Sequence, residues 1–248
     1  MEATTPPDLL DRTTLLSLLS TVAMAATAYW TSRRAVSAST STSVRFLFAW
    51  HMADALCHFI LEGSFLYHCF FSARKVSSFE GGGGGIFFPT AENFLGYGSA
   101  RGDGDGMGVV VGPQAGGGNP FALLWMVYAR ADRRWAGADL GVVSLELLTV
   151  FVDGPLACYV CYLLSKGDPR ASFWMVVLAT CELYGGFMTF CPEWLTGNLN
   201  LDGSNFMYMW VYLVFFNMLW VFIPVYAIWY SFTDICNAFA VRAAKKSV

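Results

Sequence analysis

Five long hydrophobic runs constrain this chain more than any other feature of its sequence. A helix needs about 20 apolar residues to cross the hydrocarbon core of a bilayer, and the runs approach or exceed that length. They extend over about residues 14–30, 44–71, 142–164, 171–190 and 206–232. The sequence therefore predicts an all-α fold, a polytopic membrane protein built as a five-transmembrane-helix bundle.

The composition agrees with a membrane protein and argues against other classes. Of the 248 residues, 56% are hydrophobic and 13% are charged, whereas soluble domains carry about 25% charged residues. The net charge of −3 argues against nucleic acid as a partner. Seven cysteines are an odd number, and Cys57, Cys158, Cys161 and Cys181 lie in apolar runs, so we expect buried thiols. The Cys158-x-x-Cys161 pair lacks a second pair and a nearby histidine, and we predict no metal and no cofactor.

The second run carries a polar stripe. His51, His58 and Glu62 are spaced i, i+7 and i+11, and Asp54 falls between them. On a helix of 3.6 residues per turn these side chains share one face. A charge that faces lipid costs several kcal/mol, so the stripe is predicted to face partners or a cavity. His68, near the end of the run, is predicted to lie at the membrane interface.

The other runs carry polar and aromatic residues that we also expect to face inward. These are Glu146, Thr149 and Asp153 in the third run, Glu182 in the fourth, and Trp210, Asn217 and Trp220 in the fifth.

Together these residue types supply the parts of an acid–base site. A carboxyl group buried without Lys or Arg holds its proton and can deliver it to an apolar substrate. The faces of Trp210 and Trp220 can hold a cation. Such a set would protonate an alkene, hold the carbocation and remove a different proton. The alternative is that these groups hydrogen-bond one another and pin the bundle together.

A glycine-rich segment at about 76–119 interrupts the apolar pattern. It contains the run Gly81 to Gly85, but it lacks the Gly-Lys-Ser/Thr of a Walker loop and the acidic ligands of an EF-hand. We expect a flexible, solvent-exposed insertion. A substrate lid or a partner contact is the alternative.

The stretch from Leu124 to Trp135 is typical of an interfacial amphipathic segment. We expect Trp125 and Tyr128 at headgroup depth, with the arginines of the segment snorkelling toward water.

Basic residues predict the orientation. Five spans place the termini on opposite sides, and Lys and Arg near short loops mark the cytoplasmic side. The side of the C-terminus holds most of them: Arg33, Arg34, Arg45, Lys166, Arg170, Arg242, Lys245 and Lys246. We therefore expect a cytoplasmic C-terminus. Residues 245–248 resemble a dilysine retrieval signal of endoplasmic-reticulum membrane proteins, and a plain basic tail is the alternative.

Five short motifs come in the order and spacing of a known family. They are His58-x-x-x-Glu62-Gly63, Leu124-Trp125-x-x-Tyr128-x-x-x-Asp132-x-Arg134, Glu146-x-x-Thr149 with Gly154-Pro155, Leu183-Tyr184-Gly185, and Asn217-x-Leu219-Trp220. On these motifs the chain resembles the emopamil-binding protein family (EXPERA domain), which includes the Δ8–Δ7 sterol isomerase and sigma-receptor-related binding proteins. The resemblance covers about 46–240 apart from the insertion.

The resemblance implies a domain organisation and a setting. Residues 1–43 would form an N-terminal tail and the first helix, 44–240 the emopamil-binding-like membrane domain, and 241–248 a basic tail. A steroid-sized pocket would open toward the membrane, and the protein would be a homodimer of the endoplasmic-reticulum membrane.

The resemblance also implies roles for residues at matching positions. The proton-transferring His and Glu residues correspond to His58, Glu62 and Glu146, and the pocket-lining, cation-contacting pair to Asn217 and Trp220. These five form the expected catalytic set. The expected substrate contacts are Thr149, Asp153, Tyr184, Trp210, Trp125 and Tyr128. His51 and Asp54 lack that support and are expected at the pocket mouth or in packing.

Three positions depart from the family pattern. In the family pattern that the chain resembles, the sterol isomerase has Trp at the positions of Asp153 and Ser64. Gly186 stands where an acidic residue often follows Tyr-Gly. The resemblance implies an isomerase that shifts a double bond in a sterol or related polycyclic terpenoid. The departures leave two alternatives open: a terpenoid isomerase or cyclase of the same fold, and a non-enzymatic binder of sterols or cationic amphiphiles.

Overall fold

The computed structural model describes residues 11–77 and 107–246 and shows an all-α bundle. It has five helices long and apolar enough to cross a membrane, as the sequence predicts. Their segments are α1 (Arg12–Ala35); α2, η1 and α3 (Thr42–Leu56, Cys57–Glu62, Gly63–Phe71); α5, η5 and α6 (Leu140–Leu148, Thr149–Asp153, Gly154–Lys166); α7 (Arg170–Leu195); and η6 and α8 (Met207–Phe216, Asn217–Lys246).

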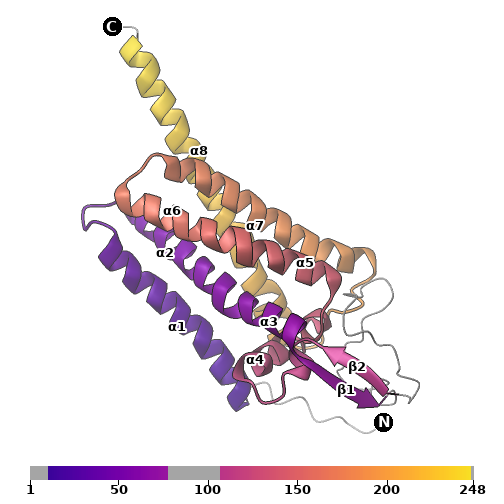
Figure 1. The fold of residues 1–248 in the computed structure, drawn as a ribbon. Coiled ribbons are helices and arrows are strands. Elements are labelled where there is room, and N and C mark those ends of the chain that lie inside the picture. The colour runs from indigo at the N-terminus through magenta and orange to yellow at the C-terminus, as the bar shows by residue number, and fades with distance from the viewer. Residues whose placement is uncertain (1–10, 78–106, 247–248) are drawn as a thin grey trace.

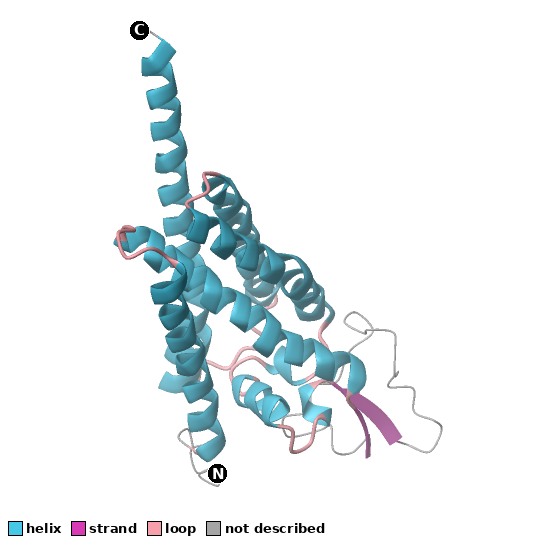
Figure 2. Cartoon of the chain, turned by 60° about the vertical axis from the view of Figure 1, so that its left-hand side comes forward, coloured by secondary structure: helices cyan, strands magenta, loops and turns pink. Residues whose placement is uncertain are grey.

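The long helices lie side by side, and their connections gather at two ends (Figure 1). The α1–α2 and α6–α7 turns share one end with the projecting C-terminal part of α8. The opposite end holds the short helix α4 (Pro120–Tyr128) and a small antiparallel hairpin of β1 (Ala73–Ser77) and β2 (Met107–Val111) (Figure 2).

Three of the spans contain π-helical segments, η1, η5 and η6. The N–H of Gly63 bonds the carbonyl of His58, and the N–H of Gly154 bonds that of Thr149, each five residues back. Pro155 has no N–H to donate four residues back, which removes one α-type bond beside η5. Such widened turns occur often at functional sites, and here they fall on the polar stripes.

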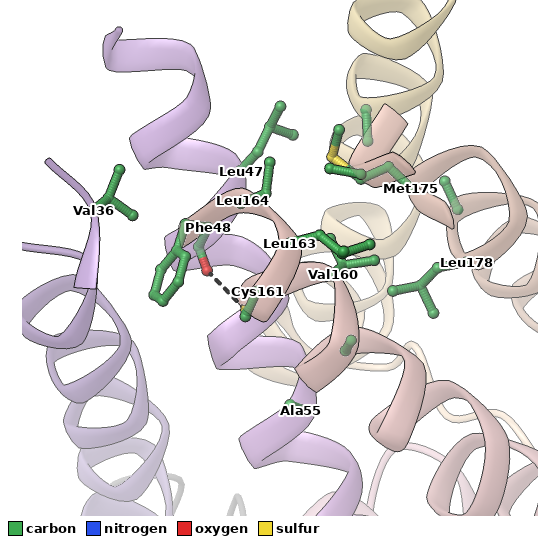
Figure 3. Packing of buried hydrophobic residues seen from close by; sticks show 14 residues of the cluster. Val36, Leu47, Phe48, Ala55, Val160, Cys161, Leu163, Leu164, Met175 and Leu178 are labelled. Atoms are coloured by element: carbon green, nitrogen blue, oxygen red, sulfur yellow. Dashed lines mark hydrogen bonds between the residues drawn. The ribbon is translucent and has the colours of Figure 1, made fainter. Parts of the chain in front are cut away.

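Apolar packing fills the end of the bundle near the C-terminus. Side chains of α2, α6 and α7 meet there, including Leu47, Leu163 and Met175, all fully buried (Figure 3). The thiol of Cys161 donates to the carbonyl of Phe48 at 3.6 Å, as expected for a buried thiol. Cys158, also expected to be buried, is exposed. This cluster fixes the three helices relative to one another.

The structure adds detail near the ends of the spans and in the segments that connect them. The end of the glycine-rich segment is ordered as β2, in which Val110 is fully buried, while 78–106 lies outside the described residues. Arg134 does not snorkel, because it is only 4% exposed and pairs with Asp132. His68 is likewise buried, and its Nδ1 lies 2.7 Å from the hydroxyl of Ser72. The basic tail continues α8 as helix to Lys246, while residues 247–248 of the dilysine motif lie outside the described part.

Gly154 sets how closely η5 approaches η1. A Cβ added there would lie 3.1 Å from the ring of Phe59 and 3.3 Å from the Cβ of His58. At Gly63, on the η1–α3 junction, the nearest atom would be 3.6 Å away, which is ordinary contact.

We therefore expect Gly154→Ala to be less stable than Gly63→Ala. Alanine gains about 1 kcal/mol over glycine inside a helix. Gly63→Ala keeps that gain, whereas Gly154→Ala loses it by forcing the two helices apart. Thermal unfolding of the purified variants in detergent measures the difference, and equal stability would contradict the proposed close approach.

Candidate functional site: an acidic cavity inside the bundle

A cavity of about 1080 Å³ lies inside the bundle, bordered by α1, α2, η1, α4, α5, η5, α7, η6 and α8. Pockets for drug-sized ligands usually measure about 300–1,000 Å³, so a polycyclic molecule fits the volume. Its wall is mostly apolar, with five carboxyl groups and one imidazole: Asp54, Glu62, Glu146, Asp153, Glu182 and His58. Among the described residues, no Lys or Arg borders it.

His58 holds two carboxylates of its own span. Its Nδ1 lies 2.6 Å from Oε2 of Glu62, one turn away on η1. Its Nε2 lies 3.1 Å from Oδ1 of Asp54, close enough for a charge contact, although the angle falls short of a hydrogen bond. The ring is only 2% exposed. One buried imidazole therefore joins two acidic groups.

Thr149 brings the third span to the same cluster. Its hydroxyl donates to Oε2 of Glu62 at 2.5 Å and lies 3.4 Å from Oε2 of Glu146. Glu62 thus receives contacts from His58 and Thr149, whereas Glu146 has the longer and weaker one. Two carboxyl groups around one hydroxyl resist ionising together. The geometry favours Glu62 as the carboxylate and Glu146 as the neutral acid.

Trp220 and Trp50 form an aromatic wall next to this cluster. The indole N–H of Trp220 donates to Oδ1 of Asp54 at 2.8 Å. The two indole rings meet edge to face with centroids 5.3 Å apart. A cation in the cavity would face π-systems and carboxyl oxygens together.

Asn217 begins α8 where the π-helical segment η6 ends. Its amide nitrogen lies 3.0 Å from the carbonyls of Tyr212 and Leu213 and 3.1 Å from the hydroxyl of Tyr128. Asn217 therefore satisfies carbonyls that the wide turn leaves open and ties α4 to α8. Burial raises the pKa of Tyr128, so its hydroxyl stays neutral.

Trp125 anchors α4 at the cavity wall. Its indole N–H reaches the carbonyl of Leu61 at 3.2 Å and the hydroxyl of Ser64 at 3.0 Å. Its ring stacks on Trp135 at 4.7 Å. Ser64, one of the departures from the family pattern, thus holds an indole rather than supplying one.

The structure brings together all five residues predicted as catalytic, as well as Thr149, Asp153, Trp125 and Tyr128. It places Tyr184 and Trp210 outside the cavity lining, with exposures of 59% and 56%. Their contact with substrate stays a prediction.

Asp54 and His51 were expected at the pocket mouth or in packing, and the structure moves Asp54 to the centre. Asp54 is 1% exposed and contacts both His58 and Trp220. His51 is fully buried within 4.8 Å of Asp54 and Glu182, the one group among the described residues whose donor atoms could hold a metal ion. The stripe spacing had placed Asp54 on the right face. The sequence pattern also predicted that Glu182 and Trp220 face inward, but it did not indicate that they lie close to Asp54.

A buried ion pair lies just outside the cavity, next to the lining residues Trp135 and Thr189. The guanidinium of Arg134 donates to both oxygens of Asp132, at 2.9 and 2.6 Å, and to the carbonyl of Thr189. Burial raises the pKa of Asp132 against the opposing effect of Arg134. Glu193, 3.6 Å from Arg134, accepts from the backbone and side chain of Asn200. This network ties the segment after α4 to the loop after α7.

An apolar cavity with carboxyl groups inside a five-helix membrane bundle defines a class, and comparison with known proteins shows what the chain is similar to. Residues 120–231, just under half of the chain, match the EXPERA (EXPanded EBP superfamily) model. This part of the chain is similar to the emopamil-binding protein family.

The relatives include sterol isomerases and a synthase. A probable 3-beta-hydroxysteroid-Delta(8),Delta(7)-isomerase of Oryza sativa subsp. japonica is 24% identical over 226 residues, 91% of this chain and 83% of the relative. Its namesake in Arabidopsis thaliana is 30% identical over 121 residues, 49% of this chain and 53% of the relative. An isomeliandiol synthase of Melia azedarach is 30% identical over 106 residues, 43% of this chain and 49% of the relative.

These similarities differ in extent. The chain spans about half the length of the Arabidopsis and Melia relatives. The EXPERA match includes Glu146, Asn217 and Trp220 but begins after His58 and Glu62. The similarity to the rice protein, at 226 of 248 residues, is long enough that it must include both.

Replacing Arg134 by Met should destabilise the protein by about 3–5 kcal/mol, because Asp132 would remain buried without a cation. The double variant Asp132→Asn with Arg134→Met should recover much of the loss, since neither charge remains. Denaturant or thermal unfolding in detergent measures both. The control is Arg133→Met at the exposed neighbouring position, expected within about 0.5 kcal/mol of the wild type. A wild-type stability for Arg134→Met would show that the network does not stabilise the protein.

Proposed function

We propose that the protein is a membrane isomerase that shifts a carbon–carbon double bond in a sterol or related polycyclic terpenoid. One observation carries the proposal: five carboxyl groups and one imidazole border a steroid-sized apolar cavity with no Lys or Arg among the described lining residues. Such a cavity favours positive charge in its occupant, and a double-bond shift by proton transfer passes through a carbocation.

The first step is proton donation to the alkene. Glu146 supplies the proton from its neutral carboxyl group, a C–H bond forms, and the π electrons of the double bond are consumed. Glu62 stays ionised because His58 and Thr149 hold its carboxylate. General acid catalysis of this kind contributes about 10²–10⁴-fold.

The second step is removal of a different proton from the cation. While the cation exists, the face of Trp220 and the carboxylates around it lower its energy. Loss of a neighbouring proton to a carboxylate of the wall forms the new double bond. The carbon skeleton undergoes no net oxidation or reduction, so no redox cofactor enters the scheme.

The names of the relatives support the substrate class. Two are probable 3-beta-hydroxysteroid isomerases and one is an isomeliandiol synthase. Asp153 borders the cavity at a position where the family resemblance implies a Trp in the sterol isomerase. This difference adds a polar group to the cavity wall on the third span. A terpenoid other than a Δ8-sterol, isomerised or cyclised by the same proton donor, is the second candidate that this feature favours.

The setting belongs to the proposal as well. The α1–α2 and α6–α7 turns and the C-terminus share one end of the bundle (Figure 1), and this end carries most of the basic residues. We place it on the cytoplasmic side of the endoplasmic-reticulum membrane. The homodimer implied by the family resemblance is part of this proposal.

Glu146→Gln and Glu62→Gln should each lower turnover by about 100-fold or more while changing substrate affinity little. Glutamine keeps the shape but can neither donate nor accept the proton. Expression in a yeast strain without its own Δ8–Δ7 isomerase, with sterols measured by mass spectrometry, tests this. Asp234→Asn, a carboxyl of α8 outside the cavity, is the matched control. If both Gln variants turn over like the control, these residues are not the proton donors and acceptors.

A binding protein without catalysis is the remaining rival, because Trp220 and the carboxyl groups suit a cationic amphiphile equally well. Tight binding of a tertiary-amine amphiphile, without conversion of any Δ8-sterol or terpenoid supplied, would favour the binder over the isomerase.

A further inference from the structure

A second group of ionisable side chains lies on the far side of His58 from Glu62. It consists of His51, Asp54 and Glu182, which are 0%, 1% and 6% exposed. One donor atom of each lies within 4.8 Å of the others. Asp54 and Glu182 also border the cavity. The scheme above leaves open which carboxylate of the wall removes the second proton.

Several buried polar atoms of this group lack hydrogen-bond partners. Within the part of the chain that the structure describes, both ring nitrogens of His51, both carboxyl oxygens of Glu182 and Oδ2 of Asp54 have no hydrogen-bond partner. Polar atoms left unpaired in an apolar setting destabilise the folded protein. Two adjacent carboxylates would add charge repulsion. One proton between Asp54 and Glu182 removes the repulsion and supplies the missing donor.

The Asp54–Glu182 pair lies beside the aromatic wall that would face the reacting cation. Trp220, the aromatic side chain that would face the cation, donates its N–H to Asp54. Asp54 and this indole therefore lie side by side in the cavity wall. His58 meets Asp54 through Nε2 and Glu62 through Nδ1, so one ring touches both acidic groups.

We propose that Asp54 and Glu182 form the catalytic base, a proton-sharing pair that removes the proton from the cation which Glu146 has generated. This inference rests on the proposed isomerase function and goes beyond it by assigning the second proton transfer. It differs from the roles that the family resemblance implies, in which His58, Glu62 and Glu146 carry out the proton transfers.

The proton count closes over one turnover. Glu146 loses a proton as the substrate C–H bond forms. The C–H bond next to the cation then breaks, its electron pair becomes the new double bond, and the proton goes to the Asp54–Glu182 pair. His58 accepts a proton at Nε2 from Asp54 and releases one at Nδ1 to Glu62. Glu62 then passes a proton to the hydroxyl of Thr149, which releases its own to Glu146. The site returns to its initial state.

A divalent metal ion is the rival occupant, because an imidazole and two carboxylates form a common set of ligands. An ion on Asp54 would bring positive charge to the Nε2 side of His58, which faces that carboxylate. The proton-sharing pair works without a metal ion. Turnover should therefore be insensitive to a strong chelator.

The test compares Asp54→Asn and Glu182→Gln with Glu146→Gln under single-turnover conditions in detergent. The substrate carries deuterium at the carbon that loses its proton. Both base variants should slow conversion about 100-fold or more and raise the substrate isotope effect above that of the wild type, since deprotonation becomes limiting. Glu146→Gln should slow conversion without that rise, because protonation limits it. Substrate affinity should stay within about twofold in all three.

Asp234→Asn is again the matched control and should behave as the wild type. Slow conversion by the base variants with an unchanged isotope effect would assign Asp54 and Glu182 a structural role and overturn the inference. Turnover equal to that of the control would do the same, as would activity lost on chelation and restored by Zn²⁺. A wild type that converts no sterol or terpenoid would instead refute the proposed function, and the assignment of the base with it.

Discussion

The contact of one buried imidazole with two carboxylates governs the rest of the site. His58 lies between Asp54 and Glu62 on a single span, and each carboxylate is in turn held from another helix, Asp54 by Trp220 and Glu62 by Thr149. Three spans are therefore fixed around a ring that is almost fully buried. Desolvation makes an unpaired charge here expensive, so loss of one member would leave the others without compensation.

The backbone supplies the geometry for this contact through irregular turns rather than loops. The π-helical segments η1 and η5 cross at Gly154, where the absence of a Cβ lets His58 and Thr149 approach the same carboxylate. Elements packed along their whole length hold such a site more rigidly than loops do. The apolar cluster of α2, α6 and α7 fixes the neighbouring part of the bundle (Figure 3).

Hydrophobic runs and polar stripes predicted the five spans and most of the cavity wall, because burial in lipid forces ionisable residues inward. Their limits follow from helix geometry. Trp210 shares a 3-4 spacing with Asn217 and Trp220, but η6 is π-helical, so that spacing does not keep one face. Tyr184 is two residues from Glu182, which places it on the opposite side of α7. The partners of Asp54 come from two other helices, and no periodicity within one span can reveal such contacts.

The long last helix has a geometric consequence for the C-terminus. From Ser231 to Lys246, α8 continues as uninterrupted helix beyond its last buried residue, and each residue advances it by about 1.5 Å and turns it by about 100°. The two terminal lysines are thus carried on a rigid spacer with a defined reach and bearing. Removing one residue from it would swing the lysine pair to a different side, whereas removing seven would shorten the reach and nearly preserve the direction.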